Sequence, residues 1–132
     1  MISLKYGNLN KETIEAINKL TTVELESSLA FRLLKIIREV NSAIEDKQKM
    51  ETRIFEKWAK KDESGNPILI KNDKGEPIPG AYDINNPDEF SKEIEHLQQM
   101  PIEIHLEKIN FTELGIEKIS VKDLLAIEFL LA

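Results

Sequence analysis

The sequence predicts an α+β fold that is mostly helical, with one long central helix, about four helices in all, and a small antiparallel sheet pairing N-terminal and C-terminal strands. Three observations predict it. Residues 22–61 contain neither Pro nor Gly. Their apolar side chains recur every three or four positions, which keeps one face of a helix apolar. Two short segments near the ends of the chain alternate apolar with polar residues, which is the period of a half-buried strand.

The first elements are a strand and a short helix. Residues 2–6 alternate between apolar and polar side chains, and a Gly-Asn pair then ends the strand. Asn10 is a favourable N-cap for a helix over residues 11–20. Thr21 and Glu24 have the spacing of a capping box, so we expect the long helix to begin directly after Thr21.

The length of the central helix is its most informative property. One unbroken helix over residues 22–61 would measure roughly 60 Å, whereas a compact domain of this size is about 36 Å across. The helix therefore projects from the body, breaks near the charged residues 45–49, or packs against another chain. Its second half is charged on most faces, and such a helix end lies in solvent or contacts a partner.

A protruding loop or hairpin insertion is expected at about residues 62–85. The Asn-Asp-Lys-Gly sequence at 72–75 separates two short apolar runs and is typical of a turn. Asn86-Pro87 then has the features of a helix start. We treat residues 1–132 as a single domain and find no internal repeat.

The last predicted elements are a helix after Asn86, a strand that pairs with the first strand of the chain, and a final helix. The helix after Asn86 ends before Pro101, and residues 102–106 form the strand that pairs with the first one. Ser120 caps a final helix over residues 121–131, which is apolar on nearly every side. Such a helix is buried, either in this core or at a subunit contact.

Composition and charge exclude several classes of protein. Cys is absent, which removes disulfides, thiolate metal sites and cysteine nucleophiles and fits a reducing compartment. No apolar run approaches the ~18 residues of a membrane span, and the first residues do not resemble a signal peptide. The net charge is −6, and residues 83–107 carry seven acids against one Lys. We therefore expect neither a membrane nor a nucleic-acid partner.

A cationic stripe on the second half of the central helix is the first candidate binding surface. Its residues recur about every four positions and have a Trp beside them: Lys49, Arg53, Lys57, Trp58 and Lys61, with Lys60 as an alternative to the last. The stripe is either a face for an anion or a nucleic acid, with Trp58 available for stacking, or a solvated face interleaved with acids. Trp58 either anchors a protein interface or packs under residues 68–70. Arg32, Lys35 and Arg38 form a shorter stripe with the same two interpretations.

The acidic segment is the second candidate surface, because Glu93 and Glu95 could help to select a partner with a basic site. No catalytic motif or phosphate-binding loop is present. The only two histidines are His96 and His105. Glu93 lies one turn before His96, but no dense cluster of metal ligands accompanies them. We expect a protein that is not an enzyme and holds no metal and no cofactor.

The chain resembles a group of short proteins encoded by bacteriophages and prophages of low-GC bacteria, most of which are described only as domains of unknown function. The segments that carry the resemblance are Glu56-Lys57-Trp58-Ala59, Lys61-Asp62-Glu63-Ser64-Gly65-Asn66-Pro67, Pro101-Ile102-Glu103-Ile104-His105-Leu106-Glu107-Lys108-Ile109 and Ser120-Val121-Lys122-Asp123-Leu124-Leu125-Ala126-Ile127-Glu128-Phe129. Trp58 replaces a more usual Tyr, and the insertion after Pro67 is longer here. The resemblance implies a phage origin and a role in the host cytoplasm. It brings no catalytic residues.

Two hypotheses of function follow. The leading one is a non-enzymatic, phage-encoded binding protein that is a homo-oligomer and contacts a host or phage protein. It would inhibit a host defence protein or assist virion or tail assembly. The alternative is an oligomeric sponge that sequesters a small signalling nucleotide between subunits through the basic stripes.

Overall fold

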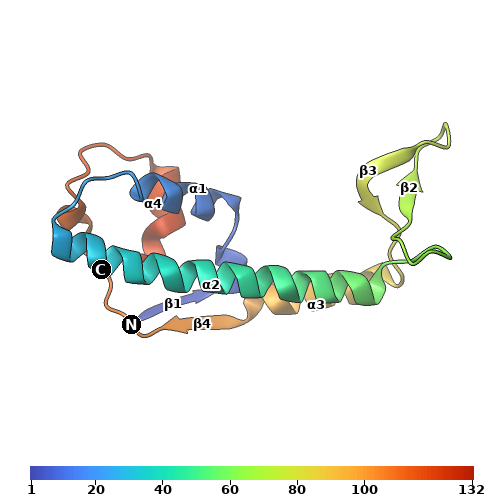
Figure 1. Ribbon diagram of the computed structural model, residues 1–132, viewed down its shortest axis with the longest axis horizontal. Helices are drawn as coiled ribbons and strands as arrows, with labels where there is room; N and C mark the ends of the chain where they lie inside the picture. Colours follow the sequence, from blue (N-terminus) through green and yellow to red (C-terminus); the bar gives the residue numbers. More distant parts are fainter. The chain divides into compact units, whose positions relative to one another are not determined.

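The computed structural model describes every residue from Met1 to Ala132. The fold is α+β with four α-helices and a small antiparallel sheet of N-terminal and C-terminal strands, as the sequence predicts, and it has a second two-stranded antiparallel sheet (Figure 1). The chain forms two compact units. Unit 1 comprises Met1–Lys47 and Gln98–Ala132, and unit 2 comprises Gln48–Leu97. That residues 1–132 fold as a single domain stays a prediction.

Unit 1 contains the sheet that joins the two ends of the chain. Strand β1 (Ile2–Lys5) pairs antiparallel with β4 (Pro101–Ile104). Ile2 lies opposite Ile104, and both side chains are buried. The predicted pairing is confirmed. Strand β4 ends two residues earlier than expected, because residues 105 and 106 leave the ladder.

Two short helices pack beside each other in unit 1. Helix α1 (Lys11–Leu20) begins after Asn10, whose Oδ1 accepts the Thr13 N–H at 3.0 Å. Helix α4 (Val121–Ile127) begins after Ser120, as predicted, and continues as a 3-10 turn over Glu128–Leu130. The Thr13 hydroxyl donates to the Ala126 carbonyl at 3.1 Å and connects the two helices.

The core of unit 1 buries only one face of the final helix, and burial of its other face at a subunit contact stays a prediction. Ile127 is buried, but Val121 and Leu125 are 73% and 64% exposed. The helix is also shorter than expected. Its apolar residues outnumber the positions that face the core, because only one side of a helix can contact α1.

Helix α2 (Ser27–Trp58) begins later than predicted. The Thr21 and Thr22 hydroxyls donate to the carbonyls of Asn18 and Lys19 at 2.6 and 2.8 Å, so they complete the end of α1. Thr21 is thus the C-cap of α1, and α2 begins six residues later, so the capping-box interpretation of Thr21 and Glu24 was wrong. The first turn of α2 instead starts from Glu26, whose carbonyl accepts the Ala30 N–H at 2.8 Å.

Helix α2 is continuous through residues 45–49, so the expected alternative of a break is excluded. Its buried side chains all precede Glu45: Leu29, Leu33, Ile36, Val40 and Ala43. They belong to the hydrophobic core of unit 1, together with residues from both sheet strands, α1 and α4. In unit 2 the buried apolar side chains are only Ala59 and Leu97.

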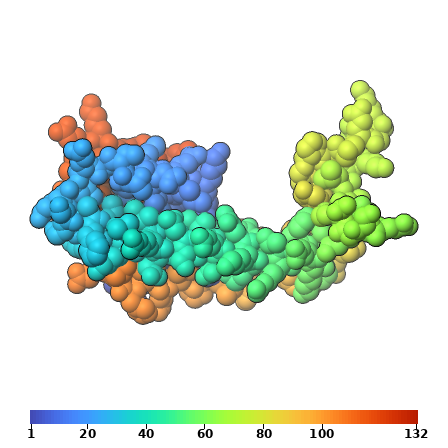
Figure 2. Space-filling view, viewed as in Figure 1, coloured from blue at the N-terminus to red at the C-terminus, as the bar shows by residue number.

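Unit 2 contains the end of α2, a β-hairpin and most of α3 (Pro87–Gln99), which begins at Pro87 as predicted. Strand β2 (Leu69–Lys71) pairs antiparallel with β3 (Pro77–Tyr82). The hairpin therefore lies within the region where an insertion was expected. Figure 2 shows residues 62–76, in green to yellow, at the surface of unit 2.

Candidate functional site

The structure brings together three of the predicted binding residues at the end of α2. Trp58 Nε1 donates to Glu93 Oε2 at 3.0 Å, and Lys57 Nζ donates to Glu93 Oε1 at 2.5 Å. The Lys57 ammonium also lies 5.0 Å from the centre of the Trp58 ring. Lys57 first, and Trp58 second, lower the pKa of the Glu93 carboxyl below its usual range. Each Glu93 oxygen thus has a donor within unit 2.

This cluster changes the interpretation of Trp58. Its indole N–H is bonded to α3, so Trp58 connects two helices of unit 2. The aromatic residue of α2 that contacts the hairpin is Phe55, whose ring meets Tyr82 edge-on at 4.9 Å between centroids. The sequence analysis considered only Trp58 for a contact with the insertion and did not consider Phe55.

The cationic stripe is partly neutralised. Lys57 is paired with Glu93, and Lys60 Nζ lies 3.3 Å from Asp83 Oδ1. Three further predicted residues, Lys49, Arg53 and Lys61, are exposed and form no ion pair, and Glu95 on α3 is likewise exposed and unpaired. The structure therefore does not gather the whole predicted set into one site.

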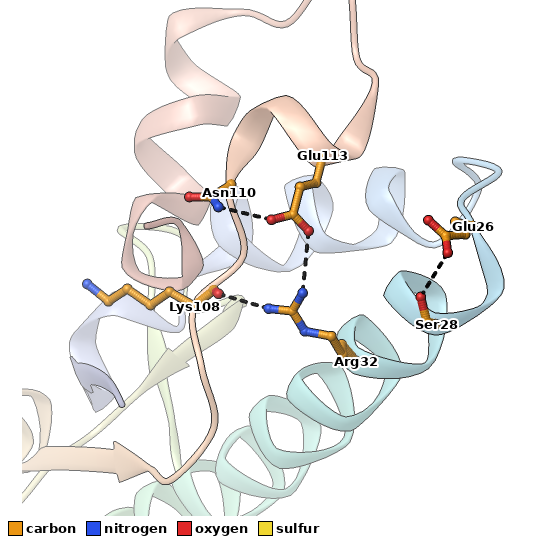
Figure 3. A network of polar contacts seen from close by, with 6 residues as sticks. All are labelled: Glu26, Ser28, Arg32, Lys108, Asn110 and Glu113. Atoms are coloured by element: carbon orange, nitrogen blue, oxygen red, sulfur yellow. Dashed lines mark hydrogen bonds and ion pairs between the residues drawn. The ribbon is translucent and has the colours of Figure 1, made fainter.

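The shorter stripe is also occupied in part, in unit 1. Arg32 donates to Glu113 Oε2 and to the Lys108 carbonyl, both at 3.3 Å, and Asn110 Nδ2 donates to the other Glu113 oxygen at 3.0 Å (Figure 3). Arg32 thereby holds the segment that follows β4. The Lys35 ammonium lies 4.7 Å from the centre of the Phe31 ring.

Residues 61–78 contain a repeat with a period of ten residues, which the sequence analysis missed. The first module is Lys61-Asp62-Glu63-Ser64-Gly65-Asn66-Pro67-Ile68, and the second is Lys71-Asn72-Asp73-Lys74-Gly75-Glu76-Pro77-Ile78. Four of the eight positions are identical, and a fifth pairs Asp with the isosteric Asn. Comparing the chain with itself at an offset of ten residues would have revealed it.

The first module forms a loop held by its own side chain. Asp62 Oδ1 accepts the N–H groups of Ser64 and Asn66, both at 2.9 Å. The Asp62 N–H donates to the Asn66 carbonyl at 2.9 Å, and the Gly65 N–H donates to the Asp62 carbonyl at 3.0 Å. Gly65 has φ +83°, a conformation that residues with a Cβ rarely adopt.

The second module repeats these bonds at the equivalent atoms. Asn72 Oδ1 accepts the N–H groups of Lys74 and Glu76 at 2.9 and 3.0 Å. The Asn72 N–H donates to the Glu76 carbonyl at 2.8 Å, the Gly75 N–H donates to the Asn72 carbonyl at 3.0 Å, and Gly75 has φ +77°. The repeat in sequence is therefore also a repeat in structure.

The modules present apolar side chains to solvent. Ile68 and Ile78, which occupy the same position in the two modules, are 36% and 39% exposed. Ile70 and Tyr82 in the hairpin strands are 46% and 39% exposed. Residues 68–82 therefore concentrate large apolar side chains at the surface, on strands that have no third strand beside them.

Unit 1 has a separate open groove of about 800 Å³. Its lining comes from the start of α1, from Lys108 and from α4 with the 3-10 turn that follows it. No group of three or more His, Cys, Asp and Glu side chains lies close enough together to hold a metal ion. None of the helices is both long and apolar enough to span a membrane.

Comparisons with protein-family models, with curated proteins and with solved structures gave no match for this chain. Assignment of its surfaces therefore depends on their own geometry and chemistry.

Proposed function

We propose that this protein is a non-enzymatic binding protein that acts through protein–protein contacts, and that residues 61–82 contact the partner. The duplicated module carries the proposal. Two loops with the same internal hydrogen bonds present the same Ile at matched exposure. Loops already held in one conformation lose little conformational entropy on binding, which favours affinity.

The charges of this segment favour a protein as the partner. Residues 61–82 contain three Lys and four acids, a balance that gives no attraction for a phosphate backbone. Exposed Ile and Tyr side chains with mixed charges around them are instead typical of a protein interface. The open strand edges of the hairpin add backbone groups that an extended segment of a partner can pair with.

The resemblance to phage and prophage proteins extends the proposal to origin and place of action. The protein is then phage-encoded and works in the host cytoplasm. Its partner is either a host defence protein that it inhibits or a phage protein in virion or tail assembly. The exposed Glu95 on α3 is available to meet a basic partner surface.

The test is quantitative affinity capture with matched variants. Immobilised wild-type protein is exposed to lysates of uninfected and phage-infected cells of a low-GC bacterium, and retained proteins are measured by mass spectrometry. Ile68→Asp with Ile78→Asp should reduce retention of the partner at least about tenfold, because each Asp introduces a charge into a desolvated contact.

The control is Phe31→Asp with Leu34→Asp, a pair on α2 in unit 1 with exposures of 55% and 39%. It should retain the partner as the wild type does. Circular dichroism verifies that both variants fold. The assignment would be contradicted if the Ile68→Asp, Ile78→Asp variant still retained the partner. It would also be contradicted if the control variant lost the partner to the same extent.

The nucleotide sponge is tested with the same proteins. Lys49 and Arg53 are its best remaining cations, since Lys57 and Lys60 already pair with carboxylates. Calorimetric titration with cyclic mono- and dinucleotides should give no heat of binding if residues 61–82 are the functional surface. The sponge would be favoured if a nucleotide bound to the wild type and to the Ile68→Asp, Ile78→Asp variant. The Lys49→Glu, Arg53→Glu variant should then have lost that binding.

A further inference from the structure

The groove in unit 1 has an apolar floor. Leu125, Ala126 and Phe129 line it, and Val121 lies one turn before Leu125 on the same side of α4. Leu125 is 64% exposed and Val121 is 73% exposed, and these are the two most exposed large apolar side chains of the chain. Exposed apolar residues one turn apart on a helix, continuous with a groove, mark a contact surface.

Four charged side chains also line the groove, and their charges balance. They are Glu12, Lys108, Lys122 and Glu128, two of each sign. All four are exposed, and none takes part in any of the six ion pairs of the chain. Figure 3 shows the Lys108 side chain directed away from Arg32, and the hydrogen bond between these two residues goes to the Lys108 backbone carbonyl.

We infer that this groove is the contact surface of a symmetric dimer, and that a second copy of this chain occupies it. In a two-fold contact the same patch meets itself, so a residue on one copy faces a different residue on the other. A patch with two cations and two anions around an apolar floor offers partners of both signs to its own copy, whereas a patch of one sign would repel it. A net-neutral groove has no electrostatic preference for an anion or for nucleic acid. The inference is independent of the proposed function, because its residues lie in unit 1.

The test is a charge exchange monitored by light scattering after size exclusion. The wild-type protein should elute with twice the mass of one chain. Lys108→Glu with Lys122→Glu gives an all-acidic groove, and Glu12→Lys with Glu128→Lys gives an all-basic one. Each variant alone should dissociate at least about 100-fold more readily, because like charges then meet across the two-fold axis. An equimolar mixture should restore a heterodimer, seen by native mass spectrometry.

Two further variants keep the test decisive. Lys49→Glu with Arg53→Glu changes the same number of charges outside the groove and should remain dimeric. Val121→Ser with Leu125→Ser removes only exposed apolar surface, so it should fold and be monomeric. A monomeric wild type at about 100 µM, variants that stay dimeric, or a mixture that fails to pair would each overturn the inference.

Discussion

The side chains of Lys19 and Asp123 form the direct ionic connection between α1 and α4. Their Nζ and Oδ2 atoms lie 2.8 Å apart. The hydrogen bond from Lys19 lowers the pKa of the Asp123 carboxyl, and the same bond raises the pKa of the Lys19 ammonium. Each group is therefore charged over a wider pH range in the folded protein than in the unfolded chain.

The stability that this pair contributes should depend on pH in two directions. The Asp123 contribution is present above its usual pKa of 3.8 and is lost as pH falls through the lowered value. The Lys19 contribution is present below its usual pKa of 10.5 and is lost as pH rises through the raised value. Thermal melts of the wild type and Asp123→Asn should differ most between about pH 5 and 9. A difference in melting temperature that does not change from acid to alkaline pH would refute this.

Local signals at single residues were predictable from the sequence, and long-range pairs were not. Asn10 and Pro87 mark helix starts by chemistry that acts over a few residues, so their roles were predicted correctly. Lys57 and Glu93 are 36 positions apart. Periodicity gives each residue a face of its own helix, but it does not say which helices meet. The pairing that ties Trp58 to α3 therefore required the structure.

At the scale of elements, predictions failed where two motifs share residues. Thr21 fits the N-cap of a capping box and also the C-cap of the preceding helix, and its residue type alone does not decide between these two positions. The turn at residues 72–75 was predicted from its Asn-Asp-Lys-Gly sequence, while the related loop around Gly65 was placed in the insertion without a predicted turn. Recognition of the ten-residue period would have predicted the fold of both loops together.

The two loops should depend on the acceptor atom of their first residue and not on its charge. Asp62→Ala and Asn72→Ala each remove an oxygen that accepts two N–H groups, which should cost about 1 kcal/mol of loop stability. Amide exchange measured by NMR should accelerate at residues 64 and 66 in the first variant and at residues 74 and 76 in the second.

The chain itself supplies the control for this experiment, because one module uses Asp and the other uses Asn. Asp62→Asn and Asn72→Asp exchange the two residue types and keep an oxygen in place. Both should retain the slow exchange of the wild type. If the exchanged variants lose protection as the Ala variants do, the loops are held by something other than these hydrogen bonds.

At the scale of the molecule, the two units differ in how much apolar surface they bury. The core cluster lies in unit 1, whereas unit 2 contributes Ala59 and Leu97 as its buried apolar residues. Burial of apolar surface is the main favourable contribution to folding. Local opening should therefore require less free energy in unit 2 than in unit 1.

Hydrogen exchange with mass spectrometry tests this difference. Peptides from α1 and the first half of α2 should exchange only by global unfolding, with the steepest dependence on denaturant. Peptides from residues 59–84 should exchange faster and with little denaturant dependence. Leu33→Ala, which removes a buried side chain of α2, should reduce protection of the unit 1 peptides by about 2–5 kcal/mol. Equal protection of both units in the wild type would show that unit 2 has support other than its own small core.

The self-contained closure of each ten-residue module has a consequence for how the gene can change. The four hydrogen bonds that the two loops have in common lie within residues 62–66 in the first loop and within residues 72–76 in the second. Gain or loss of ten codons by unequal recombination would thus alter the number of loops while leaving the apolar interior untouched. If the target protein changes, the number of these modules can change with it, and no compensating substitutions are required elsewhere in the chain.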